Sequence, residues 1–524
     1  MSEYRLVYDS GSKVLKCAIA DELGKIISLE SWEEEVIISE DGLYREWNHK
    51  NYWENLIKLT KITIKSAKID PKKIKYITAS SMRPSCVFTD DDNNAVYIGA
   101  SFECRGINYA EDIEREFKER TGESFYESTG HFPSLLFIPA RFKYFKEERE
   151  RDNRIGRITQ YLPMESWILV KFGGEVHANI TSAGESGFFD LTTKLWHPAW
   201  EDILDLPDYF FPFPVMPGEV IGTVSEDYEQ SLGLSSDTQL VAGIADTQAA
   251  MLGCQCVELG SIGAVLGTTS PIQAISSKPY FDRNEKMWNG LFACKNLFDY
   301  YYLETSTGIT GQILKWAAKL FFAEKGLTLR QQFQELDKAY SEYDRFELQS
   351  NKDLIDESCI YSLLGPSPLA STQMGTTAGL FYFQSPGGVD EIDVKRNAFI
   401  ASVFDNIQFA VTKNFEFLVD FTKVESPNYS IVGGITRNST LLQRFADLLQ
   451  TPIISSKNDE ISIQGLLVLC EVAAGNIKNL KELKSRNESL QLLKKMNPRE
   501  AMKQKLRNRY NNWKKIFQQF NKNF

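Results

Sequence analysis

The sequence predicts an α/β protein of two similar domains, and three observations support this. At 524 residues the chain is too long for a single hydrophobic core. Short apolar strands alternate with segments of helical periodicity along most of its length. Two matching hairpins, at residues 6–20 and 264–275, lie about half a chain apart. Because each is an apolar strand, a glycine, a hydroxyl residue and another apolar strand, we expect an internal duplication.

The bulk composition excludes several classes of protein. Hydrophobic residues make up 43% and charged residues 25%, as in ordinary soluble proteins. No apolar run approaches the roughly 18 residues of a membrane span, and a net charge of −11 argues against general nucleic-acid binding. The eight cysteines are scattered and there are only four histidines, which disfavours a structural zinc site. A reduced, cytoplasmic protein is expected.

The first hairpin predicts a phosphate-binding turn. Its turn contains Gly11, Ser12 and Lys13. Backbone N–H groups and a hydroxyl in such a turn can bind phosphate oxygens. Asp9, just before the turn, can hold Mg²⁺ through water. Most turns of this composition are plain hairpins, so the turn alone leaves both interpretations open.

The middle of the chain carries the strongest indication of catalysis. An apolar strand at 240–242 runs through a glycine turn into Asp246, which opens a helix. The next short strand ends in Gly267, Thr268 and Thr269. A carboxylate at a strand-to-helix turn can accept a hydroxyl proton, and a glycine–hydroxyl loop can hold the transferred phosphoryl group. The stretch predicts an enzyme that phosphorylates a hydroxyl group.

Two segments of the first half offer groups for binding a substrate. Met82 and Arg83 follow a predicted strand, where an arginine can grip a polyol or carbonyl oxygen. A surface arginine in a turn is an equal alternative. Glu103 and Arg105 can face one side of an extended segment. They can bind sugar hydroxyls there or pair with each other.

Periodicity assigns the remaining elements in chain order. Strands are expected at residues 6–8, 14–20, 74–80, 86–89, 95–98, 240–242, 264–266 and 430–432. Helices are expected at residues 51–69, 108–117, 135–150, 326–358, 396–419, 441–449 and 460–475. Residues 363–371 and 374–379 are expected to form a glycine- and proline-containing loop.

Glycines in the second half mark places where a nucleotide can approach the backbone. Residues 306–320 are expected to run from a loop into a helix, with Gly311 at the helix start. Gly433 and Gly434 follow a predicted strand, and adjacent glycines there would let a flat base lie on the backbone. A plain strand-to-helix turn is the alternative interpretation for Gly433 and Gly434.

The C-terminal end is basic. Residues 476–524 hold 14 Lys and Arg against 3 Asp and Glu. Pro498 begins a segment with apolar residues at helical spacing, which are Met502, Leu506, Tyr510, Trp513, Ile516 and Phe517. We expect an amphipathic helix packed on the body with a solvated basic face. An interaction arm is the alternative.

Together and in this order, these segments resemble the FGGY family of carbohydrate kinases. The resembling segments are residues 9–16, 242–246, 267–269, 311–316, 433–439 and 460–465. The resemblance implies two ribonuclease H-like (actin-like ATPase) α/β domains with a deep interdomain cleft. It implies phosphorylation of a sugar or polyol that depends on ATP and Mg²⁺. We expect an N-terminal domain at 1–243, a C-terminal domain at 244–475 and a helical tail at 476–524.

The resemblance also implies roles for the candidate residues. Asp246 is the general base for a primary hydroxyl, and Asp246 and Asp9 are the Mg²⁺ residues. The ATP-binding set is Gly11, Ser12, Lys13, Gly267, Thr268, Thr269, Gly311, Gly433, Gly434 and Asn438. The substrate-binding set is Met82, Arg83, Glu103, Arg105 and Asp246. The segments around Arg83 and Arg105 are most similar to autoinducer-2 kinases and related pentulokinases, which favours a pentulose or autoinducer-2-type substrate.

Three departures from the family pattern concern the substrate more than the reaction. The usual double glycine before the catalytic aspartate is replaced by residues 243–245, which end in Ala245. Glu103 stands where aspartate is usual, and Ser166 stands where many members have aspartate. A sugar-sensing protein without catalysis is therefore an alternative, as is an actin-like ATPase. The resemblance also implies a homodimer.

Overall fold

The computed structural model describes residues 3–101, 103–323, 326–350, 360–369, 379–383 and 395–523. The chain forms two compact, discontinuous units. The first unit comprises Met1–Gln255, Ser276–Leu303 and Glu460–Leu490, and the second comprises Cys256–Ile275, Glu304–Asp459 and Gln491–Phe524. Asp246 thus lies in the first unit. The functional domains expected at 1–243, 244–475 and 476–524 stay predictions.

The first unit is built on a mixed sheet of seven strands in the order β14-β15-β6-β1-β2-β3, with β16 also paired to β6. The strands are β1 (Tyr4–Ser10), β2 (Val14–Asp21), β3 (Ile26–Glu33), β6 (Ile74–Ser81), β14 (Val220–Thr223), β15 (Gln239–Val241) and β16 (Ile244–Ala245). β1 pairs antiparallel with β2 and parallel with β6. The hairpin predicted from residues 6–20 is β1–β2.

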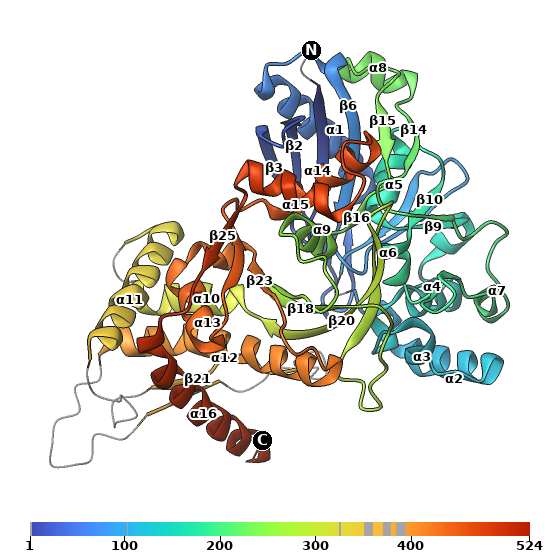
Figure 1. Cartoon of the computed structure of the whole chain (residues 1–524). Coiled ribbons are helices and arrows are strands. Elements are labelled where there is room, and N and C mark those ends of the chain that lie inside the picture. Colours follow the sequence, from blue (N-terminus) through green and yellow to red (C-terminus); the bar gives the residue numbers. More distant parts are fainter. Residues whose placement is uncertain are drawn as a thin grey trace. The chain divides into compact units, whose positions relative to one another are not determined.

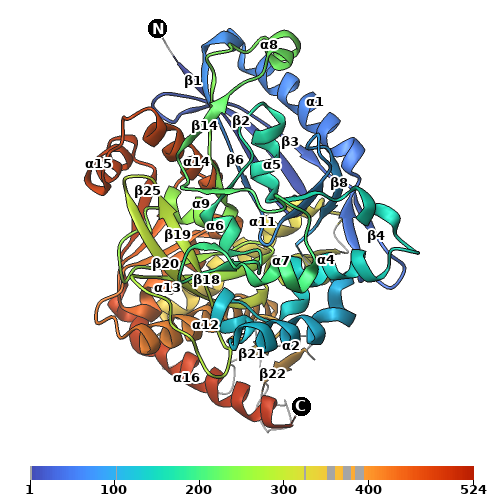
Figure 2. The same cartoon turned by 90° about the vertical axis from the view of Figure 1, so that its right-hand side faces the viewer.

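Helices cover both faces of this sheet. The helices are α1 (His49–Ala67), α5 (Met164–Lys171), α9 (Asp246–Gly253) and α14 (Ile461–Ala473). Leu6 and Tyr8 of β1 join the core cluster that contains α1 and α5, and α1 runs beside β2 and β3 (Figure 2). Since side chains alternate along a strand, Arg5 faces the other way. Its Nε donates to Glu471 of α14 at 2.7 Å.

The rest of the first unit surrounds an aromatic core. A second sheet runs β4 (Val36–Ile38), β5 (Arg45–Trp47), β8 (Ala95–Gly99), β7 (Cys86–Thr89) and β9 (Gln160–Leu162). The other elements are α2 (Ala110–Thr121), α3 (Phe125–Thr129), α4 (Ile138–Glu147), β10 (His177–Asn179), α6 (Ile180–Gly184), β11 (Phe189–Asp190), β12 (Leu195–Trp196), α7 (Ala199–Leu204), β13 (Phe213–Val215), α8 (Glu226–Leu232), β19 (Trp288–Cys294) and α15 (Leu480–Leu490).

The second unit repeats the same kind of sheet. Its sheet has seven strands in the order β19-β20-β18-β17-β23-β24-β25, of which β19 belongs to the first unit. The strands are β17 (Ile262–Val265), β18 (Thr269–Ser276), β20 (Phe298–Ile309, whose first residues belong to the first unit), β23 (Tyr429–Val432), β24 (Ile453–Ser456) and β25 (Leu493–Met496). β17 pairs antiparallel with β18 and parallel with β23. Residues 306–309 therefore belong to a strand and not, as expected, to a loop.

The helices of the second unit include a long central helix. They are α10 (Gly311–Phe322), α11 (Leu329–Gln349), α12 (Arg396–Thr422), α13 (Ser439–Leu449) and α16 (Glu500–Asn523), beside the short strands β21 (Tyr361–Leu363) and β22 (Leu380–Tyr382). The segments 351–359 and 370–378, predicted as helix and loop, lie outside the described residues. No helix among the described residues is both long and apolar enough to cross a membrane.

The C-terminal helix α16, dark red in Figure 1, packs on α12 and α13. Its apolar face contributes Met502, Leu506, Tyr510 and Trp513 to a buried cluster. Ion pairs add to this contact, since Arg509 Nη2 lies 2.5 Å from the Asp405 carboxylate. Basic residues of this helix thus help to attach it to the rest of the unit, and others lie on its exposed face.

Candidate active site

Three strand ends bring charged side chains together in the first unit. Asp9 lies on β1, Arg83 follows β6, and Asp246 follows β16. The register places Asp9 beside Ser80, and Ala245 beside Ser81. Neighbouring parallel strands end at the same edge of a sheet, which is where α/β proteins bind ligands. Accordingly, Arg83 Nε lies 3.9 Å from Asp246 Oδ1.

Asp246 lies at the start of a helix and keeps part of its side chain exposed. It is the first residue of α9, and its Oδ1 accepts hydrogen bonds from the N–H of Thr247 at 2.6 Å and from Thr247 Oγ1 at 3.2 Å. Burial raises its pKa to about 7, with the Arg83 charge lowering it and the Asp9 charge raising it. The side chain keeps 33% of its surface exposed, so a substrate can reach it.

Asp9 is the second carboxylate of this edge. Its Oδ1 accepts a hydrogen bond from Ser80 Oγ at 2.9 Å. Burial raises its pKa, while the neighbouring Lys16 and Ser80 lower it. Lys16 is itself held by an ion pair of 2.5 Å with Glu460. Carboxylate oxygens are the ligands that Mg²⁺ prefers, so the donor types of Asp9 and Asp246 fit this ion.

Arg83 is fixed by a buried acid that the sequence did not reveal. Its guanidinium donates to Glu185 Oε1 at 3.0 Å, Tyr302 Oη at 3.0 Å and Thr247 Oγ1 at 3.1 Å. Burial alone would raise the pKa of Glu185, but the charge of Arg83 and hydrogen bonds from His131 and Tyr302 lower it to about 2. Glu185 is therefore a permanent anion that holds the arginine beside Asp246.

His131 completes this network. The ring is fully buried. Its Nδ1 lies 2.7 Å from the carbonyl oxygen of Thr129, and its Nε2 lies 3.1 Å from Glu185 Oε2. The Glu185 carboxylate thus lies between the Arg83 guanidinium and the His131 ring.

Gln248 adds an unused acceptor to the same place. Its Nε2 donates to Glu185 Oε1 at 3.2 Å. Its buried Oε1 has no hydrogen-bond partner among the described residues. A buried polar atom without a partner is costly, so it favours a donor such as a substrate hydroxyl.

Other predicted substrate residues have different surroundings. Glu103 and Arg105 are buried and form an ion pair of 2.9 Å, and the arginine also pairs with Glu46 at 2.9 Å. The guanidinium lies over aromatic rings, 4.6 Å from that of Tyr97. Glu103 and Arg105 therefore pair with each other, which is one of the two alternatives expected from the sequence. Their role towards a substrate stays a prediction. Met82 is buried at the end of β6.

The turn of the first hairpin is open to a ligand. The Gly11 N–H donates to the carbonyl of Val14 at 3.1 Å, which closes the turn between β1 and β2. Ser12 and Lys13 are exposed at its tip. Their side chains are therefore accessible for the phosphate contacts predicted from the sequence.

The glycine loops of the second unit come together at the edge where β17 and β23 end. The Gly311 N–H donates to the carbonyl of Gly267 at 3.0 Å, and a Cβ on Gly311 would lie 2.8 Å from that oxygen. Gly433 has a φ of +104°, and its Cβ would lie 2.5 Å from the carbonyl oxygen of Leu266. Close backbone approach thus requires glycine at both positions.

Two residues predicted to bind the nucleotide lie next to these loops. They differ in how much open space surrounds them. Gly434 has no atom within 4 Å of the position of a Cβ, so space is open above it. Asn438 caps α13 through a hydrogen bond of 2.9 Å from the Leu441 N–H to its Oδ1, and its Nδ2 donates to Asp337 at 2.7 Å. Asn438 positions the helix that follows the glycines. Thr268 is exposed and Thr269 is half-buried.

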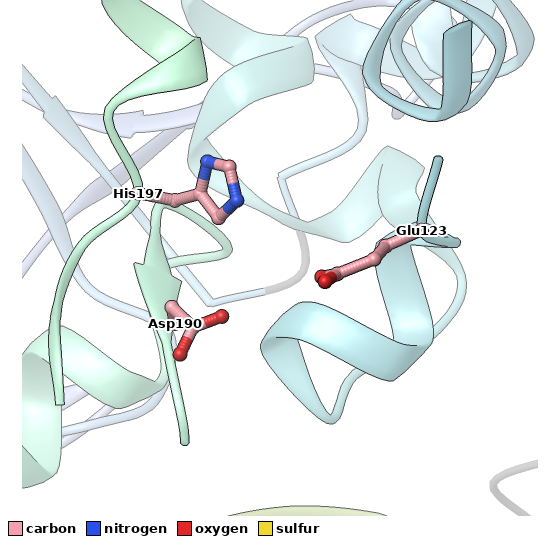
Figure 3. Close-up of side chains that lie close together, drawn as sticks. All are labelled: Glu123, Asp190 and His197. Carbon is pink, nitrogen blue, oxygen red and sulfur yellow. The ribbon is translucent and has the colours of Figure 1, made fainter. Parts of the chain in front are cut away.

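A separate group of metal-type ligands lies on the first unit. Glu123, Asp190 and His197 place ligand atoms within 4.8 Å of one another around one space (Figure 3). However, His197 Nδ1 accepts a hydrogen bond from the Ala199 N–H at 3.2 Å. A metal-bound histidine commonly donates a hydrogen bond from its second ring nitrogen, whereas Nδ1 of His197 accepts one. This arrangement fits hydrogen bonding better than metal binding.

Comparisons with known proteins identify similar kinases. Residues 4–253 match the model of the FGGY family of carbohydrate kinases, N-terminal domain. "Putative sugar kinase YoaC" of Bacillus subtilis (strain 168) is 25% identical over 470 residues, which cover 89% of each chain. The autoinducer-2 kinase of Escherichia coli (strain SMS-3-5 / SECEC) is 21% identical over 487 residues, covering 91% of this chain and 88% of the relative.

The same fold occurs in a solved glycerol kinase. The structure of Plasmodium falciparum glycerol kinase with ADP superposes with a TM-score of 0.81 at 17% identity, covering 99% of this chain and 98% of that one. The fold is that of FGGY kinases, which have two actin-like ATPase domains. Kinases of this family use ATP. Residues 4–253 thus match the N-terminal domain of the FGGY family of carbohydrate kinases, and the chain is an enzyme of the carbohydrate kinase class.

Proposed function

We propose that this kinase phosphorylates a primary hydroxyl of a small open-chain sugar or polyol, with Asp246 as the general base. A pentulose or an autoinducer-2-type molecule is the favoured substrate, as for the autoinducer-2 kinase relative. The observation that carries the proposal is the Asp246 carboxylate, which is accessible and has a pKa of about 7 beside Arg83. A general base acts best when its pKa lies near the working pH.

Each side chain near Asp246 has a separate role towards the substrate. Asp246 Oδ1 is engaged by Thr247, so Oδ2 is the oxygen that accepts the hydroxyl proton. Arg83 orients a neighbouring substrate oxygen, and the unpartnered Oε1 of Gln248 accepts from a second hydroxyl. Glu185 and His131 hold these groups in place and do not themselves react. Several fixed donors and acceptors favour a substrate with several hydroxyl or carbonyl oxygens.

The residues proposed to bind ATP and Mg²⁺ are the glycine loops and the two carboxylates described above. The glycine loops at Gly267, Gly311 and Gly433 let phosphates approach the backbone, and the space above Gly434 admits a base. Asp9 and Asp246 would hold Mg²⁺. When bound, ATP supplies the phosphoryl group and Mg²⁺ offsets its negative charge.

The test is Asp246→Asn, a substitution of nearly the same shape without the basic oxygen. ADP release with ketoses, polyols and dihydroxypentanedione should fall by roughly 10²–10⁴-fold. Nucleotide affinity, measured by calorimetry, should stay nearly unchanged. The matched control is Asp237→Asn at an exposed position of the same unit, which should keep full activity. A variant at position 246 that turns over at the unaltered rate would exclude this general base.

A second candidate function is a sugar-binding regulator without catalysis. One observation favours it, because the arginine that should grip the substrate is already bonded to Glu185, Tyr302 and Thr247. Sugar-dependent ADP release by the unaltered protein decides between the two functions. The homodimer implied by the family resemblance stays a prediction for sedimentation analysis.

A further inference from the structure

Four buried side chains connect the strand end that carries Arg83 with the one that carries Asp246. Each of the four is 0% exposed and lies in the first unit. They are Ser81 at the end of β6, Glu165 in α5, Asn179 at the end of β10 and Thr181 in α6. α5 lies against β6, and α6 lies against β16 (Figure 1). Because they are buried, these side chains differ from Asp246, which keeps part of its surface exposed.

Thr181 holds the backbone directly before Asp246. Its Oγ1 accepts a hydrogen bond from the Ala245 N–H at 3.3 Å and donates one to Asn179 Oδ1 at 2.5 Å. Since the hydroxyl proton is engaged by Asn179, the oxygen lone pairs are left to accept from Ala245. Ala245 is the N-cap of α9 and forms no cap hydrogen bond through its own side chain. The Thr181 hydroxyl thus fixes the turn that begins the helix at Asp246.

Glu165 extends this connection to the strand of Arg83. Its Oε1 accepts a hydrogen bond from Asn179 Nδ2 at 2.5 Å, and its Oε2 accepts one from Ser81 Oγ. Ser81 lies two residues before Arg83. Burial raises the pKa of Glu165, and hydrogen bonds from neutral serine and asparagine side chains lower it. A buried carboxylate is costly unless its oxygens are bonded, so the two contacts hold it firmly between Ser81 and Asn179.

Close packing restricts the segment before Asp246 at its first residue. A Cβ on Gly243 would overlap the carbonyl oxygen of Ala79 in β6 and would lie 3.2 Å from Glu165 Cγ. Backbone that approaches a neighbouring strand so closely has little room to shift. Residues 243–245 are therefore held by β6 and Glu165 at their start and by Thr181 at their end.

We infer that Thr181, Asn179 and Glu165 are positioning residues for the general base. They hold the Asp246 carboxylate in place beside Arg83, so the inference rests on the role proposed for Asp246. Since the three side chains are fully buried, they act through the two strand ends and not by contact with the substrate. A shift of about 1 Å in a reacting group can cost about 10²-fold in rate, so loss of this connection should appear in kcat.

The first test removes the Thr181 hydroxyl. Thr181→Val keeps the shape of the side chain, and kcat should fall about 10–10²-fold. It is measured by ADP release with the ketose or polyol that the unaltered protein phosphorylates fastest. ATP affinity, measured by calorimetry, should stay nearly unchanged, because the glycine loops proposed to bind ATP belong to the second unit. Thr181→Ser restores the hydroxyl and should recover most of kcat. Unaltered kcat in Thr181→Val, or no recovery in Thr181→Ser, would overturn the inference.

Thr238→Val separates positioning from stability. Thr238 is also 0% exposed, and its Oγ1 donates to the carbonyl of Ile74 at 2.7 Å, at the opposite end of β6. Each valine variant loses one buried hydrogen bond, so thermal unfolding should show a similar loss of stability in both. Only Thr181→Val should lose kcat. A similar loss of kcat in Thr238→Val would mean that lost stability alone explains it, and the inference would fail.

Ser81→Ala breaks the other end of the connection. It should also lower kcat, and this variant alone decides if Thr181→Val does not fold. Because both ends act through Glu165, the double variant should lose no more than about the larger single loss. Unaltered kcat in Ser81→Ala, or losses that multiply, would overturn the link through Glu165. Asp246→Asn keeps the two proposals apart. If it retains its rate, the proposed function fails, whereas if it alone loses its rate, only this inference fails.

Discussion

The two units share an arrangement of six strands. In the first the order is β3-β2-β1-β6-β15-β14, and in the second it is β20-β18-β17-β23-β24-β25, with β19 added beside β20. Each has an antiparallel hairpin, β1–β2 or β17–β18, whose first strand pairs parallel with β6 or β23. A further parallel strand and a closing antiparallel strand come next in both. The strand order and directions therefore occur twice, although the closing strand β14 precedes β15 in the chain and β25 follows β24.

The units differ in the residues that come directly after equivalent strands. Arg83 comes after β6 in the first unit, whereas Gly433 and Gly434 come after β23 in the second. At the strand ends of the first unit, charged side chains form ion pairs with one another. At the strand ends of the second unit, backbone segments approach one another closely at glycines. The comparison teaches that the strand order fixes where ligands can bind, while the few residues after each strand decide the chemistry.

The largest effect is expected from removing the charge that organises the first edge. Glu185→Gln keeps the size of the side chain but leaves the buried Arg83 guanidinium without its counter-charge. Breaking one partner of a buried ion pair costs about 3–5 kcal/mol of unfolding free energy. Denaturant unfolding measures this loss. The control Glu201→Gln, at an exposed site, should cost almost nothing. A loss similar to the control would mean that the network contributes little to folding.

A smaller effect is expected at the glycine edge of the second unit. Gly433→Ala must adopt a left-handed backbone and place its Cβ 2.5 Å from a carbonyl oxygen. Strain of this kind costs about 1–3 kcal/mol, and nucleotide binding should weaken because the loop must shift. Gly434→Ala has open space and is the matched control for stability. Thermal unfolding and nucleotide titration of both variants check this, and equal stability of the two would contradict it.

The smallest effect concerns pH. Because the pKa of Asp246 is raised to about 7, its basic form is depleted below that pH, and kcat/KM should fall about tenfold per pH unit there. The native state also holds the proton more tightly than the unfolded chain, so this group's contribution to stability falls as pH rises from about 4 to about 7. Asp246→Asn should therefore be more stable than the unaltered protein at pH 8, by thermal unfolding. A flat rate profile between pH 5.5 and 7.5 would contradict the assignment.

The sequence predicted those parts of the site that depend on local pattern. The hairpins, the helix start at Asp246 and the long helix α12 could be predicted from apolar periodicity and glycine positions. The strand at 306–309 was missed because its threonine, serine and glycine resemble a loop in composition. Tertiary packing on the sheet decides such a segment, and no local signal reports it.

The buried network was missed for a different reason. Tyr302 lies 219 residues from Arg83 along the chain, and Glu185 lies 54 residues from His131. A glutamate between Gly184 and Ser186 looks like a surface residue until the fold supplies its partners. Thr247 and Gln248 directly follow Asp246, and their proximity to this motif could have indicated them.

The C-terminal helix α16 packs on an element that leads to the glycines after β23. α13 begins after its cap Asn438, and its Leu448 joins Met502 and Trp513 of α16 in one buried cluster. β23 ends at Val432, immediately before Gly433. A change in how α16 packs would therefore reach the segment between Gly433 and Asn438 through α13.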